Sequence, residues 1–169
     1  MNIEKIIRKA IARNDGALLK QAYAEAYERY HGLVAFVLHG YLRDPRDVED
    51  LVDETFLRFF AYEKKEEIRS VKSFLAQSAK NLALTQLRKP EHETLQEEDV
   101  VTHDPMALFL LDLRSYLDQA ELDLLYDYYV YDLGAAEIAS SRNETVSAVR
   151  MRIARLKKKV KERFGGIPR

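Results

Sequence analysis

The sequence predicts an all-α protein of two small helical domains joined by an acidic linker. Apolar residues recur at steps of three and four through most of the chain, and no segment alternates strictly enough for a half-buried strand. A polar stretch after Pro90 interrupts this periodicity. The 169 residues suffice for two small domains. We therefore expect a helical domain at residues 1–90, a linker at 91–107 and a second helical domain at 108–169.

Composition excludes several classes of protein. With 47% apolar and 33% charged residues, the chain is unlike a disordered one. The absence of cysteine excludes disulfides, thiolate metal sites and cysteine nucleophiles, and is compatible with a reducing compartment. The N-terminal residues show no unbroken apolar core, and the run "GLVAFVLHGYL" is too short to span a bilayer. We expect a cytoplasmic protein without membrane insertion.

The first domain is expected to contain three main helices. The first, at about residues 18–42, follows the candidate capping residues Asp15 and Gly16. In "RDPRD", at 43–47, Pro45 suits a first helical turn and Asp44 can cap it, so a second helix begins there. Its apolar stripe comprises Val48, Leu51, Val52, Phe56, Phe59 and Phe60, opposite an acidic outer face. A polar loop leads to the third helix, at about 71–89, whose inward positions are Phe74, Leu75, Ala79, Leu82, Ala83 and Leu87.

Charge is distributed unevenly along the chain. The net charge is −1. Residues 91–112 nevertheless carry seven acids and no lysine or arginine, whereas residues 142–169 carry ten bases and two acids. Blocks of one sign are often solvated helix faces, but they also mark interaction surfaces.

The basic block contains a predicted helix-turn-helix, "EIASSRNETVSAVRMRIARL", beginning at Glu137. Asn143 tolerates a left-handed backbone at the turn, and Thr145 can cap the second helix. That helix has inward positions at Val146, Val149, Ile153, Leu156 and Val160. The outward side of this helix then carries small residues, which allow a close approach to base edges, and basic residues, which bind phosphates or guanine. This conjunction favours DNA binding over a purely structural helix pair.

The same stretch resembles region 4.2 of the sigma-70 family of bacterial RNA polymerase initiation factors, through its Glu-Ile-Ala, its Thr145 cap and its spaced arginines. Independently, "DPRDVEDLVDETFLRFF" at 44–60 resembles region 2.2, and "SFLAQSAKNLALTQLRK" at 73–89 resembles regions 2.3 and 2.4. The order of these motifs, with an acidic linker between them, is similar to the short two-domain group called extracytoplasmic-function (ECF) sigma factors.

The resemblance implies three sets of functional residues. The resemblance assigns docking on core RNA polymerase to Asp50, Asp53, Glu54 and Arg58. The resemblance assigns opening of the minus-10 promoter element, and capture of an unstacked base, to Phe74, Gln77, Lys80, Asn81 and Arg88. For Phe74 and Asn81, the alternative is packing or local hydrogen bonding. The resemblance assigns recognition of the minus-35 element to Thr145, Ser147, Ala148, Arg150, Met151, Ala154, Arg155 and Lys158. For Arg152, a phosphate contact and an internal salt bridge are both open.

The chain also departs from the family's pattern. Asp118, Leu122 and Tyr128 stand in region 4.1 where proline and basic residues are usual, and Asp132 replaces the usual glycine before region 4.2. These differences weaken the expectation of phosphate contact from region 4.1. The third helix of the first domain also lacks the common aromatic and basic set of region 2.3.

No enzyme is predicted. The four histidines show no metal-ligand spacing and no glycine-rich phosphate loop is present, so we expect no catalysis, cofactor or metal. The expected partners are core RNA polymerase and promoter DNA, and the resemblance allows an anti-sigma protein as a third. One alternative is a stand-alone helix-turn-helix transcription regulator whose first domain dimerises or senses a signal. The other is a sigma-like protein that only sequesters a partner.

Overall fold

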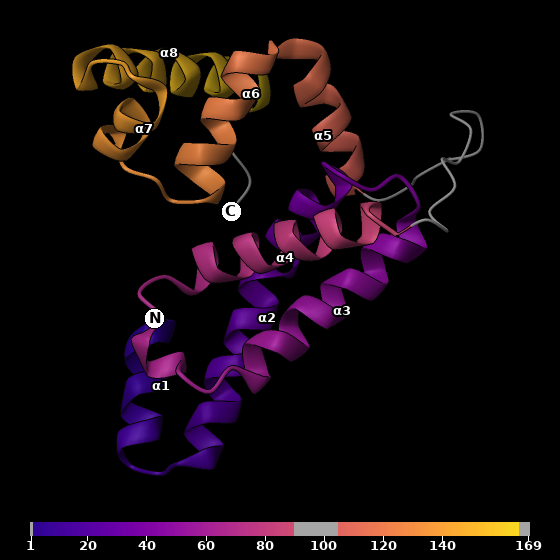
Figure 1. Cartoon of the computed structure of the whole chain (residues 1–169), viewed down its shortest axis with the longest axis vertical. Helices are drawn as coiled ribbons and strands as arrows, with labels where there is room; N and C mark the ends of the chain where they lie inside the picture. The colour runs from indigo at the N-terminus through magenta and orange to yellow at the C-terminus, as the bar shows by residue number, and fades with distance from the viewer. Residues whose placement is uncertain (1, 90–104, 166–169) are drawn as a thin grey trace. The chain divides into compact units, whose positions relative to one another are not determined.

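The computed structural model describes residues 2–89 and 105–165, and in these ranges it contains helices and no strand (Figure 1). The predicted all-α fold class is therefore confirmed. The chain divides into two compact units, residues 1–110 and 111–169. The helix α5, Pro105–Tyr116, contributes residues to both units. The predicted acidic linker at 91–107 lies, apart from its last three residues, outside the described residues.

The first unit is a bundle of four helices with one short 3₁₀ turn. Its elements are α1 (Ile3–Ala12), α2 (Gly16–His39), α3 (Pro45–Ala61), η1 (Lys65–Glu67) and α4 (Val71–Leu87). In Figure 1, α1 and α2 form a helical hairpin, and α2, α3 and α4 pack against one another. The helix α1 was not predicted, although its buried residues Ile3, Ile7 and Ala10 recur at helical spacing.

The predicted helix starts in this unit are confirmed. The Asp15 carboxylate accepts a hydrogen bond from the Leu18 backbone N–H at 3.0 Å and caps α2. The Asp44 carboxylate accepts one from the Arg46 N–H at 2.9 Å, with Pro45 in the first turn of α3. This backbone hydrogen bond lowers the pKa of Asp44 below its ordinary value, because it favours the ionised form. Both loop-to-helix boundaries thus follow from local side-chain chemistry.

Aromatic side chains fill the contact between α2, α3 and α4. The ring of Phe59 is fully buried and contacts Tyr23 at 5.6 Å and Phe74 at 5.9 Å between ring centroids. Leu87, which was expected to face inward, is 41% exposed. Because it is the last residue of α4, no neighbouring turn of helix covers it. The aliphatic core around these rings comprises Ala22, Ala26, Val34, Val37, Leu38, Val71, Leu75, Ala79 and Ala83.

The second unit packs short helices against one long one. Its elements after α5 are α6 (Gln119–Leu125), the π-helical turn η2 (Tyr126–Val130), α7 (Ala135–Arg142) and α8 (Val146–Phe164). The buried residues that join them are Leu113, Leu117, Leu122, Leu125, Val130, Ile138, Ala139, Val149, Ile153, Leu156 and Val160. Just after η2, Asp132 has a φ of 53°, which is the left-handed region that favours glycine.

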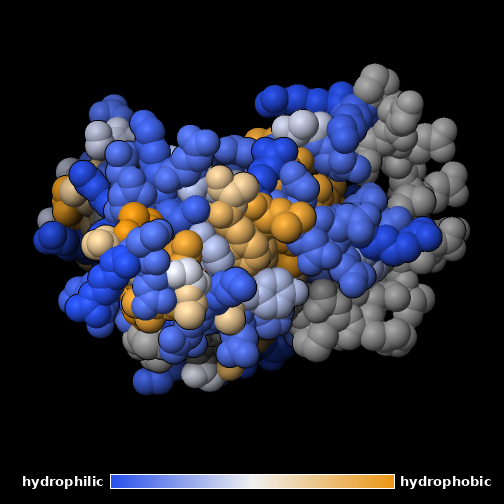
Figure 2. Space-filling view, turned by 90° about the horizontal axis from the view of Figure 1, so that it is seen from below, coloured by the Kyte–Doolittle hydropathy of each residue, from blue (hydrophilic) through white to orange (hydrophobic). Residues whose placement is uncertain are grey.

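Few large apolar side chains remain exposed. The face drawn in Figure 2 is mostly hydrophilic, with hydrophobic residues gathered toward its middle. The exposed large apolar residues of the described chain are Ile11, Tyr27, Leu57, Tyr62, Leu87, Leu111, Tyr116 and Met151. Within residues 2–89 and 105–165, no helix combines the length and hydropathy needed to cross a bilayer.

Candidate functional site

The outer side of α3 carries the four residues predicted to dock on a protein partner. Asp50, Asp53 and Arg58 are exposed and Glu54 is half-buried. Their spacing of three and four residues places all four on one helix face, which we call the α3 face. Arg58 Nε lies 3.0 Å from Glu54 Oε1, but both side chains remain open to solvent in part, so this ion pair contributes little stability. The two aspartates make no ion pair with any residue that the structure describes, so the α3 face stays net acidic.

A leucine that the sequence analysis missed lies within the α3 face. Leu57 is 60% exposed and follows Asp53 by four residues and Glu54 by three. Its departure from the buried stripe of α3 was a signal available in the sequence. An apolar side chain surrounded by charged ones is the usual arrangement at the centre of a protein–protein contact.

The predicted strand-binding residues of α4 divide into packed and exposed groups. Gln77, Asn81 and Arg88 are exposed and Lys80 is half-buried. Phe74 packs between Phe59 and Tyr62, which supports the packing alternative for its ring. Gln77, Asn81 and Arg88 follow Phe74 by three, seven and fourteen residues, so they continue along one side of α4, the α4 face.

Tyr62 extends the α4 face into the preceding loop. Its ring lies 4.9 Å from that of Phe74 and is 38% exposed. The sequence carries no signal for this position, because Tyr62 follows α3 in a loop and has no helical register with α4. A packed aromatic ring with one side open can stack an unpaired nucleobase.

Two side chains of α1 fix the loop that carries Tyr62. Arg8 donates from Nε to the carbonyl of Glu66 at 3.1 Å and from Nη2 to the carbonyl of Ile68 at 3.2 Å. Glu4 Oε1 accepts the backbone N–H of Val71 at 2.8 Å, at the start of α4. First-turn N–H groups have no partner within their own helix, so Glu4 acts as a remote cap. The helix α1 therefore holds the loop in one conformation.

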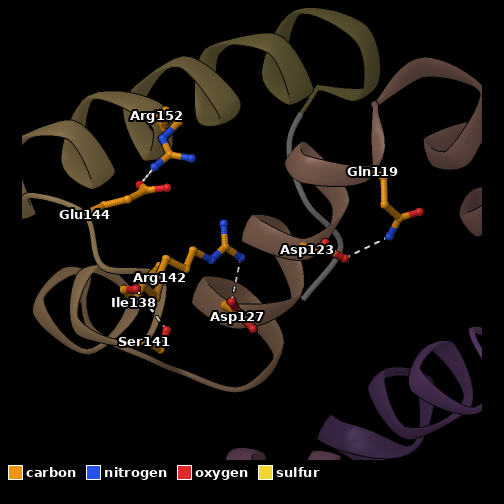
Figure 3. Close-up of polar contacts among 8 residues, drawn as sticks. All are labelled: Gln119, Asp123, Asp127, Ile138, Ser141, Arg142, Glu144 and Arg152. Carbon is orange, nitrogen blue, oxygen red and sulfur yellow. Dashed lines mark hydrogen bonds and ion pairs between the residues drawn. The ribbon is translucent and has the colours of Figure 1, made fainter.

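The turn between α7 and α8 has the predicted geometry. Asn143 adopts a left-handed conformation with φ 54° and ψ 46°, and Thr145 Oγ1 accepts the Ala148 N–H at 3.2 Å. Figure 3 shows two ion pairs around this turn, Arg152 with Glu144 and Arg142 with Asp127, the latter at 2.7 Å. The internal salt bridge left open for Arg152 is thus present.

Substitution of Asn143 tests this turn. Asn143→Val should lower the free energy of unfolding by about 1–2 kcal/mol, because a left-handed backbone is strained for a β-branched residue. Asn143→Gly removes the Cβ and should match or exceed the stability of the original chain. Urea denaturation of both variants provides the comparison. Equal destabilisation by valine and glycine would mean that the asparagine side chain, rather than the backbone conformation, holds the turn.

The lysine and arginine residues of α8 form two groups, one with contacts inside the second unit and one exposed to solvent. Lys159 Nζ lies 3.0 Å from both carboxylate oxygens of Glu121, and this hydrogen bonding raises the pKa of Lys159. Lys159 and Arg163 also lie over the ring of Tyr116, at 5.1 Å and 5.5 Å from its centroid. Lys157 lies 5.1 Å from the centre of the Tyr128 ring. These cations hold α8 against the rest of the second unit.

Other cations of α8 point away from the unit. Arg150, Arg155 and Lys158 are exposed, and none of them forms an ion pair within residues 105–165. With Thr145, Ser147, Met151 and Ala154, which are exposed, and Ala148, which is half-buried, they form the α8 face. Every residue predicted to read the minus-35 element lies on this face. The buried side of α8 consists of Val149, Ile153, Leu156 and Val160, so the outward residues add little to the fold.

No group of three or more potential metal ligands occurs among the described residues.

Comparison with known protein families finds a match over part of the chain. Residues 26–92 match the family model described as sigma-70 region 2. The matched range covers most of α2 and all of α3 and α4, and therefore both the α3 face and the α4 face. None of the curated proteins compared with the chain matches it. Residues 26–92 are therefore similar to region 2 of sigma-70 factors.

Proposed function

We propose that this chain, whose residues 26–92 are similar to sigma-70 region 2, is a sigma factor of the extracytoplasmic-function group that directs core RNA polymerase to specific promoters. The observation that carries the proposal is the region 2 match over α2–α4. The exposed cations of α8, in the other unit, support a second contact with DNA. Such a protein acts in the cytoplasm, performs no catalysis of its own, and accepts an anti-sigma protein as a further partner.

Each face has a separate role in this proposal. The acidic α3 face, with Leu57 at its centre, docks on a basic surface of core polymerase. The α4 face takes up a strand of the minus-10 element once it is unpaired, with the exposed ring of Tyr62, packed against Phe74, as an aromatic platform and Arg88 near the phosphates. The α8 face enters the major groove of the minus-35 element, where its cations contact phosphates and guanine edges.

Run-off transcription tests the function as a whole. Purified core polymerase, the chain and DNA from upstream of the chain's own gene are combined, and the 5′ ends of the transcripts are mapped. We expect a discrete start site that core polymerase alone does not use. DNA binding to a palindrome without polymerase, and no new start site, would instead favour the stand-alone regulator. Polymerase binding without initiation on any genomic fragment would favour a protein that only sequesters its partner.

Tyr62 gives a prediction specific to strand opening. Tyr62→Ala should reduce the open complexes at a fixed promoter about tenfold, because stacking on an aromatic ring contributes about 1–3 kcal/mol per base. Tyr62→Phe keeps the ring and should retain most of the activity. Permanganate reactivity of unpaired thymines measures opening, and co-purification with core polymerase should be unchanged in both variants. If Tyr62→Ala opens the promoter normally, the role of Tyr62 is limited to its packing contact with Phe74.

A further inference from the structure

The exposed side of α8 has an apolar side chain at its centre. Met151 is 56% exposed, although α8 carries eight bases and one acid. Residues four apart on a helix form a stripe along one side. Met151 lies in the stripe of Ser147 and Arg155, and the neighbouring stripe consists of Arg150, Ala154 and Lys158.

The neighbours of Met151 leave it open to a ligand. Ala154, three residues on, has too small a side chain to cover it, and α8 buries its opposite side in the unit. A group that covers Met151 must present an apolar atom at that point. The same ligand must also bind the cationic side chains of Arg150 and Arg155, so it has to carry negative charge around that apolar atom.

The major groove of duplex DNA has both properties. Its rims carry phosphates, guanine presents two acceptors on the floor, and thymine presents a C5 methyl group. The deep, narrow major groove of RNA duplexes does not admit side chains in this way. Met151 lies six residues after the Thr145 cap, about 9 Å along the helix, within the part of a recognition helix that reaches base edges. Glu162, the one acid of α8, lies about 16 Å farther along the helix.

We propose that Met151 contacts the C5 methyl group of a thymine in the element bound by α8, and so makes that thymine a determinant of promoter choice. Arg150 and Arg155 bind the adjacent guanine edges or phosphates. This inference rests on the proposed function, because it requires α8 to lie in the major groove of promoter DNA.

Replacing thymine by deoxyuridine tests the contact, since only the methyl group is removed. The probe is the fluorescent promoter duplex at which the complex of the chain with core polymerase initiates. Each thymine of its upstream element is replaced in turn, and the dissociation constant of the complex is measured. At one thymine we expect binding about fourfold weaker, because burying one methyl-sized group contributes about 0.8 kcal/mol. Met151→Ala should bind the two duplexes equally.

Lys158→Ala is the matched control. It removes a cation from the α8 face and should weaken binding to both duplexes while it keeps the fourfold difference between them. The proposal is overturned if no thymine shows the effect, or if the effect persists in Met151→Ala. It is also overturned if Met151→Ala weakens association with core polymerase in the absence of DNA, because a protein then covers this residue. Failure to initiate at any promoter would instead contradict the proposed function.

Discussion

Replacing both Asp50 and Asp53 with lysine is expected to abolish association of the chain with core RNA polymerase. The two carboxylates are exposed on the α3 face beside Leu57, so the substitutions remove two attractive charges and place two repulsive ones there. Like charges that face each other across an interface cost several kcal/mol. The measurement is co-purification of the variant with tagged core polymerase, followed by its activity in run-off transcription.

The fold of this variant should remain intact. Neither aspartate is paired within the described part of α1–α4, and surface substitutions away from packed groups usually change stability by about 0.5 kcal/mol or less. Glu28→Lys with Glu67→Lys is the matched control, since it changes the net charge equally at exposed positions outside α3. The control should retain polymerase binding. If both double variants bind core polymerase normally, the α3 face is not the docking surface.

Arg150→Ala should weaken promoter binding and alter sequence preference. An arginine that donates two hydrogen bonds to guanine contributes about 1–3 kcal/mol of discrimination, which corresponds to about five- to 150-fold in affinity. The measurement is binding of the polymerase complex to a library of promoters randomised in the upstream element. We expect relaxed preference at one position and unchanged preference elsewhere.

Arg152 provides the control for this prediction. It lies two residues from Arg150 on the same helix, but it is paired with Glu144 inside the unit. Arg152→Ala should leave the sequence preference unchanged and affect mainly the stability of the α7–α8 turn. A uniform loss of affinity by Arg150→Ala across all promoters would assign Arg150 to phosphate binding.

The helix boundaries were predictable where a single side chain determines them. Asp44 and Thr145 have short polar side chains that accept backbone N–H groups, and Asn143 tolerates the left-handed region. These effects depend on residues within one turn, so they can be inferred from the sequence. The apolar periodicity of α3 and α8 likewise indicates which residues face outward.

Long-range contacts could not be predicted in the same way. Glu4 caps α4 across 67 residues, and Lys159 pairs with Glu121 across 38. Sequence periodicity indicates the helix face on which a basic residue lies, but not whether an acidic residue from another element lies beside it. For this reason the division of the α8 cations into internal and outward groups, and the fixing of the Tyr62 loop by α1, required the structure.

The most direct test locates both units on one promoter. The chain has no cysteine, so Ser147→Cys on α8 and Thr85→Cys on α4 each give a single attachment point for a DNA-cleaving iron chelate. In complex with core polymerase, cleavage from position 147 should fall near the minus-35 element and cleavage from position 85 near the minus-10 element. Cleavage at one common place from both positions, or no localised cleavage from either, would contradict the claim that the two units contact different promoter elements.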